Sequence, residues 1–371
     1  FFILTRVLIN NVNYKMIKII KSYIQATKYV YYLASFKDSK IPSLKFSDEH
    51  YIGLDQNKTI VRIFHSKKKE NQSIIIFPGA SPYAEKHPGM MMLGDSLRKI
   101  GYNVYLPRVP SLKNLVLDKD NVNWFAHCYQ ELVKNKIGFR DDIMIIGLSY
   151  GGASLLKATL NKKMQNPQPK SILSYGTYFS IDTALDFFIT GQIKFNNKNF
   201  NIKPHEWGPI VLFYNFIDTI KSELNTKQIK KILHHRIKDE HVIVEKELNK
   251  MDDNSKEKKL ISNILDGKVT KKMHLIINQM IKTNKDLLEF ISPKNWIHQI
   301  NNKVFIMHGA NDSMVPFTES TFLHQSLKNS TLLISFLYEH KEISTNRGIF
   351  FKIKEFLKLI KFNADYIKYN L

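Results

Sequence analysis

The sequence is poor in cysteine and in acidic residues, and it has no long uncharged apolar run. Cys128 is the one cysteine among 371 residues, so an intramolecular disulfide is excluded and a reducing compartment such as the cytoplasm is expected. Charged residues from Arg6 to Lys28 interrupt the apolar start of the chain, and no stretch reaches the roughly 18–20 uncharged residues of a membrane span. No signal peptide with a small-residue cleavage site is predicted.

Acidic residues are outnumbered, since 55 Lys and Arg stand against 33 Asp and Glu, for a formal net charge of +22. Such an excess is typical of proteins that bind nucleic acid or anionic membranes. The lysines, however, are spread along the whole chain, and the sequence has no aromatic-plus-basic nucleic-acid motif and no phosphate loop. We therefore predict no nucleic-acid partner.

Metal-binding spacings are also missing. His234, His235 and His241 are close in sequence, but adjacent histidines point to different faces of a helix, and their spacing fits no metal motif. We predict neither a metal nor another cofactor.

What the sequence contains is the composition of a globular protein, with 43% hydrophobic and 24% charged residues. Residues 1–45 are basic and rich in Ile and Tyr, and an amphipathic helix is expected there, packed on the core or lying on a membrane surface through residues 1–40. Residues 46–180 and 301–371 carry the signals of one α/β domain. Residues 181–300 show helical periodicity and many charges, which indicates a helical insertion.

Short apolar runs alternate with helical segments in the two parts of the α/β domain. This alternation is typical of βαβ units, and strands that are apolar throughout indicate a mainly parallel sheet with helices on both faces. The predicted strands are residues 60–64, 73–77, 103–106, 143–146, 171–175, 304–307 and 332–337, and the predicted helices include residues 90–100, 124–136 and 349–360.

Ser149 lies at the centre of the sequence Gly147-Leu-Ser149-Tyr-Gly151. An apolar run precedes it and a helical pattern follows it, so the chain must turn sharply at the serine. Glycines two residues on either side remove the Cβ atoms that would clash in such a turn, and the strained serine exposes its hydroxyl. This context predicts a nucleophilic serine.

A serine hydroxyl is a weak nucleophile until a base takes its proton and a third group orients that base. Asp312 and His340 each follow one of the last two predicted strands, in the order acid and then histidine. Asp218 in the insertion is a second candidate acid, and His308 and His324 are further candidate histidines.

Two motifs and one isolated histidine are similar to those of the α/β-hydrolase superfamily. They are Gly147-Leu-Ser149-Tyr-Gly151-Gly152, His308-Gly309-x-x-Asp312-x-x-Val315-Pro316, and His340. The chain resembles in particular the esterase, monoacylglycerol-lipase and serine-aminopeptidase-like members of this superfamily. The resemblance covers residues 58–180 and 300–360. It implies an α/β-hydrolase fold in which a helical cap, residues 181–300, covers the active site.

The resemblance also implies the roles of the residues. Ser149 would attack a carbonyl carbon, His340 would move the proton, and Asp312 would stabilise the imidazolium. The oxyanion hole would use the backbone N–H groups of Tyr150 and Ala80. Two other polar side chains of the Ala80 loop, Glu85 and His87, are expected on the surface without a catalytic role.

We therefore expect a cofactor-free serine hydrolase that cleaves a carboxylic ester with an acyl or monoacylglycerol-like group. Four aromatic residues of the insertion are candidates to line the acyl site: Phe187, Phe188, Trp207 and Phe213. The same catalytic residues would serve a thioesterase, an amidase or a peptidase, so the bond type stays open. A catalytically silent protein of this fold, docked at a membrane surface, is the hypothesis from another class. The sequence makes no prediction of the oligomeric state.

Overall fold

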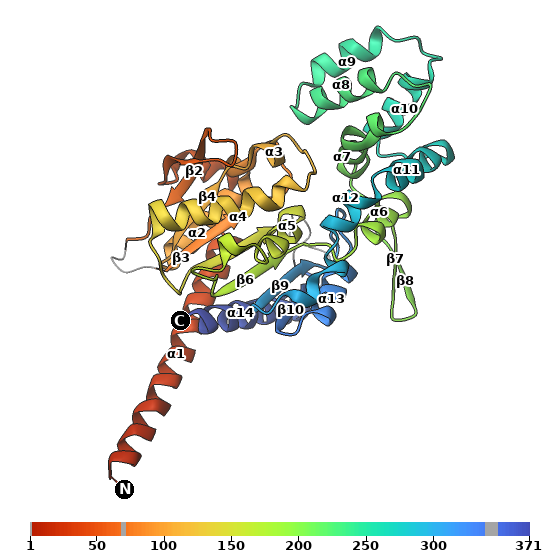
Figure 1. Ribbon diagram of the computed structural model, residues 1–371. Helices are drawn as coiled ribbons and strands as arrows, with labels where there is room; N and C mark the ends of the chain where they lie inside the picture. The colour runs from red at the N-terminus through yellow and green to blue at the C-terminus, as the bar shows by residue number, and fades with distance from the viewer. Residues whose placement is uncertain (1, 68–71, 338–347) are drawn as a thin grey trace.

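The computed structural model describes residues 2–67, 72–337 and 348–371, with side chains from Tyr14 onward. Eight strands within these residues form one sheet, and all seven predicted strands are among them (Figure 1). The strands are β1 (Ser47–Ile52), β2 (Lys58–Phe64), β3 (Ser73–Phe77), β4 (Asn103–Pro107), β5 (Met144–Leu148), β6 (Ser171–Tyr175), β9 (Val304–Gly309) and β10 (Ser330–Ser335).

The sheet is mainly parallel, which confirms the predicted fold class. Its strand order is β1-β2-β4-β3-β5-β6-β9-β10, and only the β1–β2 and β2–β4 pairs are antiparallel. In the parallel part, Leu148 at the end of β5 pairs with Tyr175 at the end of β6, and Tyr175 pairs in turn with Met307 of β9. The loops that follow these three strands therefore begin at the same edge of the sheet.

The sheet is buried on both faces, as continuous apolar strands require. In β3, Ile74 and Ile76 belong to one hydrophobic cluster, whereas Ile75 and Phe77 belong to a second cluster on the opposite face. All four side chains are fully buried, and each contributes roughly 1.5–3 kcal/mol to folding by leaving water.

Helices cover the two faces. The first face carries α1 (Phe2–Ala34), α2 (Pro88–Ile100) and α14 (Ile349–Asn370). The second carries α4 (Asp120–Leu132), α5 (Tyr150–Ala158) and α13 (Phe317–Ser326), and the short α3 (Pro110–Lys113) follows β4.

The long helix α1 packs on the core through its second half only. Ser22, Ala26, Tyr29 and Val30 are buried against α2 and α14, and the Gln25 amide donates a hydrogen bond of 3.0 Å to the carbonyl of Ile100. The first half extends away from the body of the molecule (Figure 1). Within the described part of the chain, no helix is both long and apolar enough to cross a membrane.

The insertion between β6 and β9 is mostly helical and projects beyond one end of the sheet domain (Figure 1). It comprises α6 (Ile181–Thr190), α7 (Trp207–Phe216), α8 (Thr226–Ile237), α9 (His241–Asn249), α10 (Lys256–Leu265), α11 (Lys271–Thr283) and α12 (Lys285–Ile291). A hairpin of β7 (Gln192–Phe195) and β8 (Lys198–Asn201), which the sequence did not predict, interrupts the helices.

Candidate active site

Ser149 occupies a strained turn between β5 and α5. Its backbone has φ 51° and ψ −126°, a conformation that a residue with a Cβ rarely adopts. Its amide donates a hydrogen bond to the carbonyl of Tyr175 at 2.7 Å, and its carbonyl accepts from the amide of Gly152 at 2.9 Å and from the Thr177 hydroxyl at 3.3 Å. The sharp strand-to-helix turn predicted from the sequence is present.

The glycines around Ser149 are required by close contacts. An added Cβ would lie 2.0 Å from the carbonyl oxygen of Pro78 at Gly151, 1.9 Å from the Thr177 hydroxyl at Gly152, and 2.7 Å from the Cα of Gly152 at Gly147. Real Cβ atoms do not approach other atoms so closely. The turn can form only because these side chains are absent.

The loop after β3 lies directly against the serine. A Cβ at Gly79 would be 3.3 Å from the Cβ of Ser149 and 3.0 Å from the carbonyl oxygen of Leu148. Ala80 is the next residue of this loop, and Tyr150 is the first residue of α5. First-turn amides of a helix have no carbonyl partner within the helix, so they are suited to an anionic oxygen.

The Tyr150 side chain points away from this region into the core. Burial raises the pKa of its phenol to about 12, and the hydroxyl accepts a hydrogen bond of 3.3 Å from Asn121. Tyr150 therefore offers the site its backbone and not its hydroxyl.

Asp312 follows β9 at the same edge of the sheet, and its side chain is 2% exposed. One carboxylate oxygen, Oδ1, accepts hydrogen bonds from the amides of Met314 at 2.7 Å and Val315 at 2.9 Å. The other oxygen, Oδ2, would lie 3.5 Å from a Cβ at Gly176, the residue after β6. The carboxylate is thus fixed beside the strand that carries the Ser149 hydrogen bond.

His308 also lies near Asp312, but its ring is held on both sides. The ring is fully buried, Nε2 is 2.9 Å from the carbonyl oxygen of Val315, and Nδ1 is 2.6 Å from the Ser320 hydroxyl. Because a carbonyl only accepts, Nε2 carries a hydrogen and donates it to Val315. These bonds, and the 3.6 Å between Nε2 and Asp312 Oδ2, suit a residue that supports the acid loop.

Two further candidate residues lie away from the serine turn. His324 is on α13, and its Nδ1 is 2.7 Å from the Ser330 hydroxyl. Asp218 is in the insertion and forms an ion pair of 2.6 Å with Lys230. His340, the predicted base, lies outside the described residues, so its role stays a prediction from the sequence.

One expectation about the Ala80 loop is wrong. Glu85 is not a surface residue, because its side chain is 0% exposed and forms an ion pair with Arg108. Its partner lies on the loop after β4, so the pair ties two loops together at this edge of the sheet. His87 is half-buried and accepts a hydrogen bond of 3.1 Å from the amide of Gly89 at the start of α2.

A cleft of about 700 Å³ lies between these loops and the insertion. Ala80 and Tyr83 line it from the loop after β3, Asn311 and Met314 line it from the acid loop, and Trp207 lines it from the insertion. The cleft therefore begins at the loop that touches Ser149 and extends to α7.

The aromatic residues predicted to line an acyl site do not lie together. Trp207 lines the cleft, whereas Phe187 and Phe213 are fully buried in the core. Phe188 is partly buried and packs against the same core, close to the Cβ position of Gly208 on α7. Trp207 is thus the one of these four aromatic residues that a ligand in the cleft would contact.

Charged residues to which the sequence did not point connect the two sides of this cleft. Asp239 accepts a hydrogen bond from the Tyr83 hydroxyl across the cleft and lies 3.3 Å from the Arg236 guanidinium. This hydrogen bond raises the pKa of Tyr83, with burial and the charge of Asp239 adding to the effect. Arg236 also pairs with Glu206 at 3.2 Å. Their partners are distant in sequence, and only the Arg236–Asp239 spacing carries a local signal.

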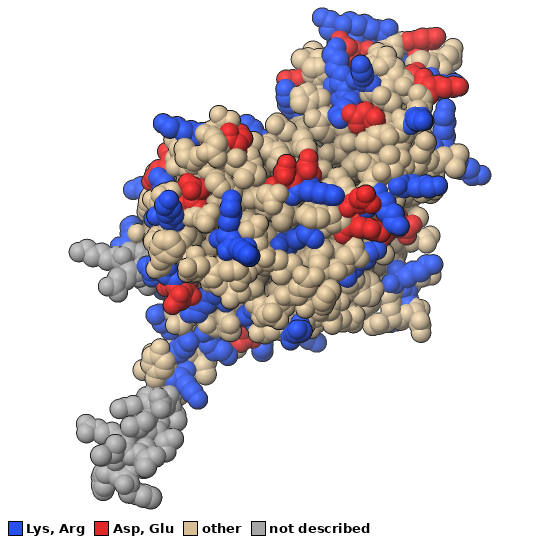
Figure 2. All heavy atoms as spheres, in the orientation of Figure 1, with Lys and Arg blue, Asp and Glu red and all other residues tan. Residues whose placement is uncertain are grey.

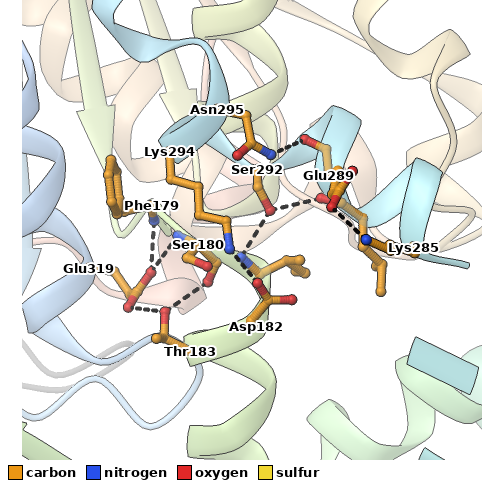
Figure 3. Close-up of polar contacts among 12 residues, drawn as sticks. Phe179, Ser180, Asp182, Thr183, Lys285, Glu289, Ser292, Lys294, Asn295 and Glu319 are labelled. Atoms are coloured by element: carbon orange, nitrogen blue, oxygen red, sulfur yellow. Dashed lines mark hydrogen bonds and ion pairs between the residues drawn. The ribbon is translucent and has the colours of Figure 1, made fainter. Parts of the chain in front are cut away.

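A polar cluster surrounds the points where the chain leaves and re-enters the sheet domain (Figure 3). The buried Glu319 of α13 accepts hydrogen bonds from the amides of Phe179 at 2.9 Å and Ser180 at 2.8 Å, and from the Thr183 hydroxyl at 2.7 Å. On the returning segment, the Ser292 hydroxyl accepts from the amide of Ile181 at 3.1 Å. These bonds fix the insertion to the loop that follows Tyr175, and thereby to the serine turn.

Strand order and the position of Ser149 decide the fold. A mainly parallel sheet with an antiparallel second strand carries a serine on a strained turn after β5 and an acid after β9. The chain has the α/β-hydrolase fold. Ser149 follows β5 and Asp312 follows β9, the two positions at which this fold carries a nucleophile and an acid.

Comparisons with known proteins give one family model that matches part of the chain and several similar solved structures. The family model described as BD-FAE matches residues 225–327, a part of the chain that includes Asp312 but not Ser149 or His340. No curated protein sequence matches the chain.

Similar solved structures include the esterase EaEST from Exiguobacterium antarcticum, with 16% identity, a TM-score of 0.45, and coverage of 87% of this chain and 100% of that one. An alpha/beta hydrolase superfamily protein from Enterococcus faecalis has 12% identity, a TM-score of 0.47, and coverage of 87% and 98%. The acylaminoacyl peptidase of Pyrococcus horikoshii has 14% identity and a TM-score of 0.45, and the chain covers 42% of its length.

Proposed function

We propose that this α/β-hydrolase-fold chain is a serine hydrolase that cleaves a carboxylic ester through an acyl-serine intermediate. The observation that carries the proposal is the backbone conformation of Ser149, which has a φ of 51°. The tight packing around Gly147, Gly151 and Gly152 maintains this conformation. Strain of this kind persists only where the surrounding structure enforces it, and it clusters at functional sites.

In the proposed reaction, the Ser149 hydroxyl oxygen attacks the carbonyl carbon of the ester while His340 takes the hydroxyl proton. Asp312 holds the imidazole in the required orientation and stabilises its positive charge. Two amides fix Asp312 Oδ1, and Oδ2, which lies on the side of Gly176 after β6, is the oxygen that we propose to orient the histidine. The imidazolium then gives its proton to the leaving alcohol, and water hydrolyses the acyl-serine by the same steps.

The negative charge on the tetrahedral intermediate needs preorganised donors. We propose the backbone N–H groups of Tyr150 and Ala80 for this role. The contact between Gly79 and Ser149 supports the second donor, because it brings the Ala80 loop to the serine. Losing one such donor typically lowers kcat by about 10²–10³-fold.

We propose an ester with a medium-length acyl or monoacylglycerol-like group as the substrate class. The cleft beside Ala80 has about 700 Å³, within the range of small-molecule sites. Its lining mixes apolar side chains, such as Trp207, Val211 and Met314, with a few polar ones such as Asn311 and Ser313. In this proposal the insertion acts as a cap that supplies the apolar side of the site.

The test is hydrolysis of p-nitrophenyl esters of increasing acyl length by the wild type, Ser149→Ala and His340→Ala. We expect both variants to lose at least about 10³-fold in kcat. Ser154→Ala on α5 and His324→Ala on α13 are matched controls that remove the same atoms outside the proposed triad. A folded wild-type protein without activity toward any ester in the series would favour a catalytically silent protein.

A further inference from the structure

Helix α1 carries an apolar stripe on the side that does not pack on the core. Met16, Ile17, Ile20, Ile24 and Tyr31 make up this α1 stripe, and all are more than half exposed; Ile17 reaches 63%. Their positions in the sequence place them on one side of the helix, opposite the buried Ser22, Ala26 and Val30. An apolar face this long, without a partner in the described chain, is typical of an interaction surface.

The charges on α1 are all of one sign. Its 33 residues contain Arg6, Lys15, Lys18, Lys21 and Lys28 and no Asp or Glu. Lys15, Lys21 and Lys28 are exposed; Lys21 and Lys28 lie beside the α1 stripe, whereas Lys15 lies on the opposite side of the helix. Where the described part of α1 leaves the body of the molecule, Figure 2 shows blue basic and tan side chains.

A second helix, α14, also exposes apolar and basic side chains. α14 packs against α1, and the exposed side chains of its first half include Phe350, Ile353 and Leu357, with Phe350 86% exposed. The spacing of these residues again places them on one side of the helix. A shallow apolar hollow of about 220 Å³, lined by Ile353, Phe356 and Leu357, lies on the same helix, and Lys354 and Lys358 are exposed next to it.

From this arrangement we propose that α1 docks on an anionic lipid bilayer surface, with α14 as the adjoining contact. The α1 stripe enters the boundary between headgroups and acyl chains, and the lysines beside it contact lipid phosphates. Charge complementarity decides the occupant. A second copy of the chain would bring two helices of uniform positive charge together, whereas an anionic surface matches apolar and basic side chains at once. This inference is independent of the reaction proposed for Ser149.

The experiment is vesicle co-sedimentation of the full chain with phosphatidylcholine vesicles that contain or lack phosphatidylglycerol. The apolar variant is Ile20→Asp/Ile24→Asp, and the charge variant is Lys21→Gln/Lys28→Gln. Leu275→Asp is the matched control, because Leu275 is a 72% exposed apolar residue on α11 in the insertion. All of these positions are exposed, so the fold should survive, and thermal unfolding verifies this.

We expect the wild type and Leu275→Asp to bind the anionic vesicles equally well. The apolar variant should bind at least about tenfold more weakly. Each lysine removed should weaken binding roughly fivefold, and added salt should weaken wild-type binding. Equal binding by all variants, equal binding to neutral vesicles, or no binding by the wild type would overturn the proposal. So would a wild-type dimer in light scattering that the apolar variant converts to a monomer.

Discussion

The carbonyl oxygen of Pro78 lies 2.0 Å from where a Cβ of Gly151 would stand. This contact joins the loop after β3 to the first turn of α5, so the two proposed oxyanion donors, Tyr150 and Ala80, lie on segments that touch. The serine turn and the loop opposite it therefore form one packed unit.

Gly151→Ala should push the loop after β3 away from α5. The methyl group cannot be accommodated without separating Pro78 from α5, and we expect a loss of about 2 kcal/mol or more in the free energy of unfolding. Because a displacement of about 1 Å can cost 10²-fold in rate, esterase activity should fall by at least about that factor. Gly348→Ala is the control, since none of the described residues lies within 4 Å of its Cβ position and its φ is −57°. Wild-type activity of the folded Gly151→Ala protein would contradict the role given to this contact.

Asp312→Asn tests the acid. The amide oxygen can still accept from the amides of Met314 and Val315, so the loop should keep its shape while the charge is lost. We expect kcat to fall by roughly 10³–10⁴-fold with a stability change below about 1 kcal/mol. The matched substitution Asp218→Asn, in the insertion, should leave kcat unchanged. The opposite pattern would make Asp218 the acid.

Glu319 should make stability depend on pH. Burial is the main cause that raises the pKa of its carboxyl in the folded protein, against hydrogen bonds from Ser180, Thr183 and Phe179. The folded state therefore holds a proton that the unfolded state has released, and stability falls as the pH rises from the ordinary pKa of 4.5 through the raised value.

Glu319→Gln removes this ionisation and keeps an acceptor and a donor. Urea unfolding from pH 4 to pH 7 should show the free energy of unfolding of the variant rising relative to that of the wild type. The rise should be about 1.4 kcal/mol for each unit by which folding raises the pKa of Glu319. Glu223→Gln is the control, because the Glu223 side chain is 91% exposed. Parallel pH profiles for the wild type and Glu319→Gln would show that the Glu319 pKa is not raised by folding.

Trp207 should set the preference for acyl length. Its indole lines the cleft, and the Arg236 guanidinium lies 5.1 Å from the ring. Trp207→Ala should lower kcat/KM for octanoate esters by about 10–100-fold and for acetate by less than about threefold, because only the longer chain reaches the lost surface. Leu275→Ala removes an exposed apolar side chain outside the cleft and should change neither value. An equal loss for both esters would place the acyl chain elsewhere.

The sequence predicted the parts of the fold whose signal is local. The strand at residues 171–175 matches β6 in both bounds, because a continuous apolar run between loops has few other conformations open to it. It missed β1, an edge strand whose side chains alternate between partly buried and exposed and which includes three charged or titratable residues, Asp48, Glu49 and His50. It also missed the β7–β8 hairpin, although Asn196-Asn197, both with positive φ, is the turn signal that would have found it.

Features that depend on distant partners were beyond the sequence. Glu85 looked like a surface residue because its burial depends on Arg108, and the buried Glu319 depends on amides about 140 positions earlier in the chain. The cleft residues Tyr83, Asp239 and Arg236 meet only after the insertion has folded against the loop after β3. The turn at Ser149 and the position of Asp312 after a strand could be predicted because both depend on neighbouring residues in the sequence.

The most direct test of the central claim is to label the protein with a fluorophosphonate and locate the adduct by peptide mass spectrometry. We predict one adduct, on Ser149, that forms in the wild type and in Ser154→Ala and is absent from Ser149→Ala. The rate of labelling should fall at least about 10³-fold in His340→Ala. An adduct on another residue, or labelling of His340→Ala at the wild-type rate, would contradict the account.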